Sequence, residues 1–578
     1  MRRSHRSLFG GVFAGVVALG GGLAHAGLDR DHGICTWDQW GGGADHEGDT
    51  CVAAQDPLRE LAHIVYDPFE FQEIAELDGG LGVHYQAPLS DAEGNFFMMH
   101  KAGTYVSCDP PGSGEPAPCG IDPANVRNEV WEEKGYHFRA DGSAQERWTF
   151  ASDWKPPTVG FFEAMFQPAL SGPFIYIPGA GGSVFQVLKV NGFRLQRLKP
   201  FRDLSPDTSV VGGVTTDRLG FIYWNVVRTD PTTGLRGGYI VKAAPWGAIK
   251  AVEYQRLIPG APAPSDACTT EIFRLTPPPP FPWPPPGFVA PTTPCGPQRP
   301  GMNLTPAIGP DGTVFTASRA DGEANYSYVI ALHPDLSLKW ATSLRGLVHD
   351  GCGHEILPNG FLCPPGTADG VDQYTNLAPA QEVDDSSSSA PVALPDGGVI
   401  YGALRDYDLF RGILLKFDRH GAFAASYDFG WDTTPAVYQH DGTYSIITKD
   451  NQYLHEFSFA QGPFYVTQLS EDLQIEWQYE NTTAQACVLQ PDGSLQCTDR
   501  DPTATGFEWC VNAPAVDKNG KVFAVAEDGN LFVISQGGVL ESKIFLNQSL
   551  GAAYTPGAID AQGRIYALNN GELSIFGR

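Results

Sequence analysis

The sequence predicts an all-β repeat protein, a β-propeller of about eight four-stranded blades, because one phrase recurs along the chain. Each copy joins small residues or proline to a hydrophobic residue, a turn containing glycine, and then alternating aromatic and β-branched residues. No segment sustains the 3.6-residue apolar period of a helical solenoid. The eight copies are QAPLSDAEGNFFMM from Gln86, QPALSGPFIYI from Gln167, GGVTTDRLGFIYW from Gly212, TPAIGPDGTVFTAS from Thr305, APVALPDGGVIYGA from Ala390, TPAVYQHDGTYSII from Thr434, APAVDKNGKVFAVA from Ala513 and TPGAIDAQGRIYAL from Thr555.

Each copy is expected to form a β-hairpin. Turns such as Asp311-Gly312 and Asn519-Gly520 supply the positive φ values that tight connections require. A second hairpin usually follows, as in GILLKFDRHGAFAASYDF from Gly412, and two hairpins make a four-stranded blade. The third copy lacks the proline, which leaves seven blades as the alternative.

The two ends of the repeat region predict how the ring closes. The last copy ends with GELSIFGR from Gly571, one strand short of a blade, while FEFQEIAEL, residues Phe69–Leu77, stands alone before the first copy. We therefore expect this N-terminal strand to complete the last blade, because closure removes exposed strand edges. The propeller is expected to span residues 69–578.

Two insertions are expected to decorate the propeller, near residues 104–139 and 259–300. The second contains the proline run from Pro277 to Gly287, a stiff polyproline II arm. The arm is either a ligand for an aromatic groove or a cover over a blade edge, and the flanking cysteines favour the cover. Residues 27–68, rich in glycine and aspartate, precede the propeller as a lead-in.

Residues 1–26 have the pattern of a secretory signal peptide. Three arginines precede an apolar stretch from Leu8 to Leu23, and Ala24-His25-Ala26 is a small-x-small cleavage signal. The protein is therefore expected to be secreted or periplasmic, and no later run is apolar enough to span a membrane. The formal charge of −28 argues against nucleic acid as a partner, since phosphate binding depends on Lys and Arg.

The eleven cysteines predict disulfides, because an exported chain meets an oxidising environment. No CxxC pair, haem-attachment motif or HExxH motif points to a metal site instead. Sequence does not determine connectivity, and Cys510, left over, could replace Cys497 or stay a thiol. The ten others form neighbouring couples: Cys35/Cys51, Cys108/Cys119, Cys268/Cys295, Cys352/Cys363 and Cys487/Cys497.

A candidate site follows from the blade geometry. Innermost strands begin beside the central channel, so residues just before the repeated phrase converge from different blades. The carboxylates Glu163, Asp385, Asp432 and Glu508 could hold Ca²⁺, and Trp or Tyr could stack on a planar ligand. Ordinary polar turn chemistry is the alternative. The full candidate set is His84, Tyr85, Glu163, Asp384, Asp385, Trp431, Asp432, Glu508, Trp509, Asn512 and Tyr554.

The phrases from Thr305, from Tyr328 (YVIALHPDLSLKW) and from Ala513 resemble the PQQ-like repeats of the quinoprotein alcohol dehydrogenase-like propellers. The resemblance covers residues 69–578 and implies the propeller fold. In catalytic members of that superfamily, pyrroloquinoline quinone (PQQ) and Ca²⁺ lie near the axis; other members are cofactor-free, including outer-membrane assembly scaffolds. This chain lacks the adjacent cysteine pair and the haem motif of the alcohol-oxidising enzymes, and Trp340 and Trp477 are interpreted as packing between blades.

Two functions are consistent with these patterns. The first is an exported, non-catalytic binding or scaffold propeller that holds a protein or extracellular polymer. The second is a PQQ- and Ca²⁺-dependent oxidoreductase with its active site at the acidic axial mouth. The missing catalytic signatures favour the first, whereas convergence of the four carboxylates on one cavity with an aromatic floor would favour the second.

Overall fold

The computed structural model divides the chain into two compact units, Met1–Gly33 and Ile34–Arg578. All of the residues that the structure describes belong to the second unit, so the expected signal peptide lies outside them. They are residues 35–76, 83–105, 128–157, 163–270, 284–353, 366–372, 375–405, 411–430, 432–453, 462–490, 492–509, 511–548 and 556–578.

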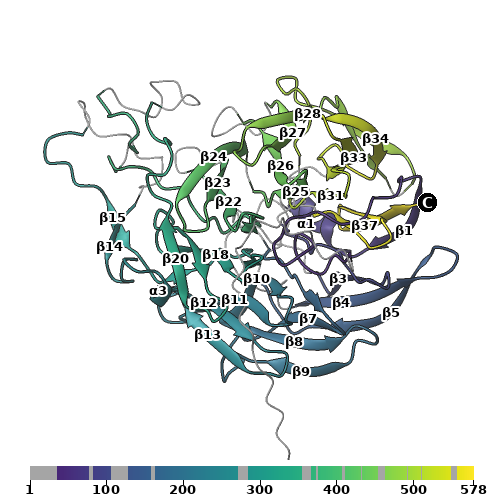
Figure 1. The fold of residues 1–578 in the computed structure, drawn as a ribbon, viewed down its shortest axis with the longest axis horizontal. Coiled ribbons are helices and arrows are strands. Elements are labelled where there is room, and N and C mark those ends of the chain that lie inside the picture. The colour runs from purple at the N-terminus through teal and green to yellow at the C-terminus, as the bar shows by residue number, and fades with distance from the viewer. Residues whose placement is uncertain are drawn as a thin grey trace, which may run out of the picture. The chain divides into compact units, whose positions relative to one another are not determined.

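The second unit is a β-propeller of eight four-stranded blades arranged in a ring (Figure 1), which confirms the predicted fold class. From the innermost strand outward, blades 1 to 4 are β2 (Leu89–Ser90), β3 (Phe96–Gly103), β4 (Glu129–Phe138) and β5 (Ala144–Ala151); β6 (Ala169–Ser171), β7 (Phe174–Gly179), β8 (Ser183–Leu188) and β9 (Arg194–Leu198); β10 (Thr208–Thr216), β11 (Ile222–Thr229), β12 (Arg236–Ala243) and β13 (Ile249–Glu253); and β17 (Ala307–Ile308), β18 (Val314–Ala320), β19 (Tyr328–Leu332) and β20 (Leu338–Ser343).

The remaining blades follow the same antiparallel order. Blades 5 to 8 are β21 (Val392–Ala393), β22 (Val399–Leu404), β23 (Gly412–Phe417) and β24 (Phe423–Gly430); β25 (Ala436–His440), β26 (Thr443–Asn451), β27 (Phe464–Leu469) and β28 (Ile475–Glu480); β31 (Ala515–Val516), β32 (Val522–Val525), β33 (Asn530–Ser535) and β34 (Val539–Phe545); and β35 (Ala558–Ile559), β36 (Ile565–Asn569), β37 (Glu572–Gly577) and β1 (Arg59–Val65).

A few elements lie outside this pattern. The strand β16 (Gln298–Arg299) pairs with β18 beside β17, and the helix α3 (Tyr254–Leu257) follows β13. Two hairpins pair only within themselves: β14 (Ala267–Thr269) with β15 (Thr292–Pro294), and β29 (Gln485–Leu489) with β30 (Leu495–Asp499). In the described part of the chain, no helix is long and apolar enough to cross a membrane.

An N-terminal strand closes the ring, as predicted, but a different segment forms it. The closing strand is β1, which pairs antiparallel with β37 near the C-terminus (Figure 1), so the propeller begins at Arg59. The prediction of a strand at Phe69–Leu77 was wrong, because the structure has the helix α1 (Glu70–Glu76) there. The helix buries Glu70 and Glu73 and leaves Phe71 60% exposed, so its polar face, not its aromatic one, packs on the ring.

The insertion expected at 104–139 is also shorter than predicted. Residues Glu129–Phe138 form β4, a strand of blade 1, so the excursion spans only the chain between β3 and β4.

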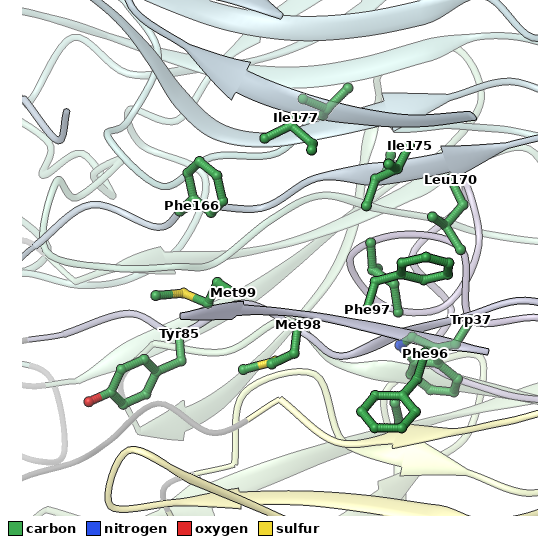
Figure 2. Close-up of a cluster of buried hydrophobic side chains, with 14 of the residues drawn as sticks. Trp37, Tyr85, Phe96, Phe97, Met98, Met99, Phe166, Leu170, Ile175 and Ile177 are labelled. Carbon is green, nitrogen blue, oxygen red and sulfur yellow. The ribbon is translucent and has the colours of Figure 1, made fainter. Parts of the chain in front are cut away.

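The core lies between neighbouring blades. In β3, Phe96, Phe97, Met98 and Met99 are all buried, because each face of the blade is covered by another sheet. Phe97 and Met99 lie on the side of β3 that faces blade 2, and Phe96 and Met98 lie on the opposite side (Figure 2). The Phe96 ring is 5.6 Å from that of Tyr566 in blade 8. Runs of apolar residues therefore serve two blade interfaces at once.

Tryptophans of outer strands join neighbouring blades. The Trp340 Nε1 group donates to the carbonyl of Arg419 at 3.1 Å, and its ring lies against Gly421 in blade 5. The ring of Trp477 lies against Gly538 in blade 7 in the same way. Trp340 and Trp477 thus pack between blades, as the sequence suggested.

The N-terminal lead-in runs across one end of the channel and hydrogen-bonds to every blade in turn. Its partner in each blade belongs to the innermost strand or to the turn that follows this strand. The contacts are Trp37 with Ser90, Asp38 with Leu170, Gln39 with Thr216, Ala44 with Ile308, Asp45 with Ala393, Glu47 with Val437, Gly48 with Val516 and Gln55 with Gly563.

Three of the expected disulfides are present: Cys35–Cys51, Cys268–Cys295 and Cys487–Cys497. The last pairing excludes the exchange of Cys510 with Cys497. Cys352 is disulfide-bonded, but Cys363 lies outside the described residues, as do Cys108, Cys119 and Cys510.

Candidate functional site at the channel axis

Three of the predicted site residues converge at the axis from blades 1, 6 and 7. The His84 Nε2 and Asp432 Oδ2 atoms are 3.8 Å apart, and Asn512 Nδ2 donates to Asp432 Oδ1 at 3.0 Å. All three side chains are buried. Residues that precede the repeated phrase in blades 1, 6 and 7 therefore do lie together.

Protein donors surround the Asp432 carboxylate. It accepts hydrogen bonds from Ser387 Oγ at 2.6 Å, from the Ser388 backbone at 2.8 Å and from Asn512. Burial alone raises its pKa, but the nearby His84 and the bond from Ser387 outweigh burial and hold the pKa of Asp432 below its usual value. A ligand at this carboxylate has to compete with these donors.

Glu163 and Tyr85 belong to a second buried cluster, centred on Lys101. The Lys101 ammonium lies 3.0 Å from a carboxylate oxygen of each of Asp67, Glu73 and Glu163. Tyr85 donates its hydroxyl to Asp67 at 3.0 Å. The two clusters meet where His84 Nδ1 donates to the Glu163 carbonyl at 3.2 Å.

Burial dominates the electrostatics of the Lys101 cluster. It raises the pKa of Glu163 to about 7 and that of Glu73 to about 8, and Lys101 only partly offsets this. The sequence analysis missed Lys101, Asp67 and Glu73. The available signal was one lysine near the end of the otherwise apolar run FFMMHKAG.

Asp385 lies in a separate ion-pair network. Arg299, fully buried, binds it bidentately with contacts of 2.6 and 2.7 Å and also contacts Asp321. Burial raises the pKa of Asp385, but the charges of Arg299 and Arg319 hold it well below its usual range. Asp384, its neighbour, accepts a hydrogen bond from Ser386.

Glu508 and Trp509 are engaged elsewhere. Tyr453 donates to Glu508 Oε2 at 2.8 Å, and burial together with the charge of Glu527 raises the pKa of Glu508 well above its usual value. Trp509 is a core residue, with its indole N–H on the Phe464 carbonyl and its ring 4.8 Å from Phe532. Trp431 and Tyr554 lie outside the described residues.

The described residues do not form a quinone pocket. The gap lined by Asp384, Ser387, Ser389 and Asp432 has almost no volume that a water molecule could occupy. Pockets for small molecules usually have at least about 300 Å³. Trp509, the described tryptophan among the candidates, is fully packed and offers no free face for a planar ring. PQQ, a tricyclic molecule, therefore does not fit the described part of the axial mouth.

A larger hollow lies at the outer rim, between blades 1 and 2. Its volume is about 420 Å³, and its lining includes Phe97, Tyr136, Trp148 and Val190. A second hollow of about 240 Å³ lies beside Lys521. Both of these hollows lie away from the axial carboxylates.

The chain resembles solved β-propellers. It is 10% identical to the quinohemoprotein alcohol dehydrogenase from Comamonas testosteroni, covering 94% of this chain and 81% of that chain with a TM-score of 0.47. For BamB from Moraxella catarrhalis the identity is 10%, the coverage 77% and 88%, and the TM-score 0.35. No family model and no curated protein matches the sequence. The likeness to these structures concerns the fold alone.

Proposed function

We propose that this protein is an exported, non-catalytic binding or scaffold propeller. One observation carries the proposal: each of the four candidate carboxylates is already paired within the protein. Lys101 pairs with Glu163, Arg299 with Asp385, serine and asparagine donors with Asp432, and Tyr453 with Glu508. Buried carboxylates that pair with neighbouring side chains contribute to the structure of the ring.

Export to a secreted or periplasmic location is supported by the disulfides and by the signal-like N-terminus. Three disulfides link described cysteines, and such bonds persist in oxidising compartments.

The proposed binding surface lies on the turns of blades 2 and 3. Large apolar side chains are exposed there at Val190, Phe193, Leu219 and Trp246, the last 74% exposed. The turns touch, since Gln196 of β9 donates to the Pro245 carbonyl at 2.8 Å and Phe221 packs on Trp246 at 5.7 Å. Grouped exposed apolar residues mark protein contacts. The acidic charge of −28 favours a protein partner with basic residues beside an apolar segment.

A titration with PQQ tests the non-catalytic part of the proposal. The purified protein receives micromolar PQQ with and without Ca²⁺, and thermal unfolding and dye-linked oxidation of alcohols and sugars are measured. We expect no PQQ-dependent stabilisation and no oxidation. Saturable PQQ binding that Asp432→Ala abolishes, accompanied by oxidation, would establish the oxidoreductase alternative.

Photo-crosslinking tests the binding surface. A benzoylphenylalanine at position 246 should give a discrete covalent adduct in the native compartment, and Leu219→Ser should abolish it. The control places the same probe at Asp230, in the exposed turn at the other end of blade 3. An adduct from position 230 alone, or adducts unaffected by Leu219→Ser, would contradict the assignment of this surface.

A further inference from the structure

We propose that Glu73, Glu129 and Glu163 form a binding site for a divalent cation of the Ca²⁺ class. One oxygen from each carboxylate lies within 4.8 Å of the others, and all three residues are buried. They come from α1, from the start of β4 and from the lead-in to blade 2. Of the carboxylates that the sequence predicted as metal ligands, only Glu163 belongs to this set.

A second observation is that the cluster contains buried oxygens with nothing to bind. Glu73 Oε2 and Glu129 Oε1 have no hydrogen-bond partner among the described residues. Glu129 is 1% exposed. Because an unsatisfied charged oxygen costs free energy when it is removed from water, such atoms are expected to have a partner. The ammonium of Lys101 contacts Glu73 through its other oxygen, so it does not fill this role.

The charges of the cluster do not balance. Four carboxylates, those of Asp67, Glu73, Glu129 and Glu163, surround the single ammonium of Lys101. Lys155 adds one positive charge where its ammonium contacts the Glu129 carbonyl. A divalent cation beside these two lysines balances the charge of these four carboxylates.

The donor set selects the class of ion. All three ligands are hard carboxylate oxygens, which suit Ca²⁺, Mg²⁺ or Mn²⁺ rather than Zn²⁺ or Cu²⁺. Ca–O distances are about 2.4 Å, so oxygens that lie within 4.8 Å of one another can share one Ca²⁺ ion. Glu73 and Glu163 each already place one oxygen 3.0 Å from Lys101, which leaves the other carboxylate oxygens of the cluster as ligands.

The site would fasten the segment that follows the closing strand. Tyr66, directly after β1, donates its backbone N–H to Gly571 of blade 8 at 2.9 Å, and α1 follows within a few residues. Glu73 on α1 therefore links this segment to blade 1 through Glu129 and to blade 2 through Glu163. An ion bound by these three carboxylates would connect the segment after the closing strand β1 to blades 1 and 2.

The test is a Ca²⁺ titration of the full chain after treatment with EDTA, by calorimetry and by thermal unfolding, with no quinone present. We expect one Ca²⁺ per chain and a higher unfolding temperature in its presence. Glu129→Gln should weaken binding at least tenfold and abolish the thermal shift. Its matched control is Glu132→Gln, on the same strand, whose carboxylate is 4.0 Å from Lys134 near the surface. This control should bind as the wild type does.

Folding of the variant is checked independently. Glu129→Gln removes a buried negative charge, so its ion-free form should unfold at or above the temperature of the ion-free wild type. Tb³⁺ luminescence excited through nearby Tyr or Trp provides a second measure of occupancy. Absence of Ca²⁺ binding at millimolar concentration, or equal Ca²⁺ binding by folded Glu129→Gln, would overturn the proposal. Neither outcome bears on PQQ binding, so this site and the proposed function are tested separately.

Discussion

His46 in the lead-in couples the stability of the propeller to pH. It is fully buried, its Nδ1 donates to the Pro391 carbonyl at 2.9 Å, and burial lowers its pKa to about 4. The unfolded chain protonates this histidine near pH 6.5, so between pH 4 and 6.5 the unfolded state binds more protons. The free energy of unfolding should therefore rise with pH across that window, by about 1.4 kcal/mol per pH unit from this group.

Denaturant unfolding of the wild type and His46→Gln at several pH values measures this slope. The variant should have a smaller slope between pH 4.5 and 6.5. His63→Gln is the contrasting control, because hydrogen bonds that its imidazole donates to Glu572 and Glu60 raise the pKa of His63 to about 9, and its contribution is lost as pH rises instead. Equal slopes for the wild type and His46→Gln would show that the buried histidine does not control acid stability.

At the scale of single residues, the sequence predicted which candidate residues lie near the axis better than it predicted which side chains pair with them. The convergence of His84, Asp432 and Asn512 follows from the repeats alone, since each residue precedes the innermost strand of its blade. Arg299 and Lys101, which form ion pairs with Asp385 and Glu163, lie far from those two residues along the chain. Their burial depends on three-dimensional packing that no local pattern records, so these ion pairs could not be predicted.

At the scale of elements, the contact of Trp340 with Gly421 should limit which residues position 421 accepts. Gly421 has φ +82°, and a Cβ there would lie 2.5 Å from the Trp340 ring. Gly421→Ala should lower the free energy of unfolding by about 2–4 kcal/mol, through backbone strain together with overpacking. Gly442→Ala is a matched control, because Gly442 has φ +80° but no atom within 4 Å of the added Cβ.

Denaturant unfolding of both variants separates the two effects. Gly442→Ala carries only the backbone strain, about 1–2 kcal/mol. The additional loss in Gly421→Ala then reports the contact between blades 4 and 5. If the two variants are equally destabilised, the contact of Trp340 with position 421 does not contribute to the free energy of unfolding.

The closing strand shows where prediction of elements failed. FEFQEIAEL has an aromatic alternation that suits a strand, but its Glu, Gln, Ala and Leu residues also favour a helix. In the structure the segment is helical, and its Glu73 contacts the buried Lys101. The segment RELAHIV, which forms β1, lies between the turn signals Asp56-Pro57 and Asp67-Pro68, and it pairs with β37.

At the scale of the whole molecule, the eight blades were predictable because eight similar phrases impose the same local structure. Each copy specifies a hairpin, and stacking of neighbours buries its two faces, so local and global preferences agree. The path of the lead-in around the channel had no such signal. Its backbone bonds to seven blades and the bond of the Gln39 side chain to blade 3 depend on the finished ring and not on any repeated side chain.

The large negative charge makes a prediction for the molecule as a whole. With a formal charge of −28 at pH 7, mutual repulsion of carboxylates opposes the compact state, and salt screens it within a Debye length of about 8–10 Å. Raising NaCl from 20 to 300 mM should stabilise the protein by about 1 kcal/mol, seen as a higher unfolding midpoint at a fixed heating rate. Sucrose at the same osmolality controls for excluded solute.

The dependence of stability on the type of cation distinguishes charge screening by NaCl from Ca²⁺ binding at the proposed site. Screening acts gradually over hundreds of millimolar and is alike in the wild type and Glu129→Gln, because both retain nearly all of the surface charge. Stabilisation by Ca²⁺ should instead saturate at far lower concentration and disappear in Glu129→Gln. A fall in the unfolding midpoint with NaCl would mean that favourable ion pairs, such as those of Arg299 and Lys101, outweigh the net repulsion.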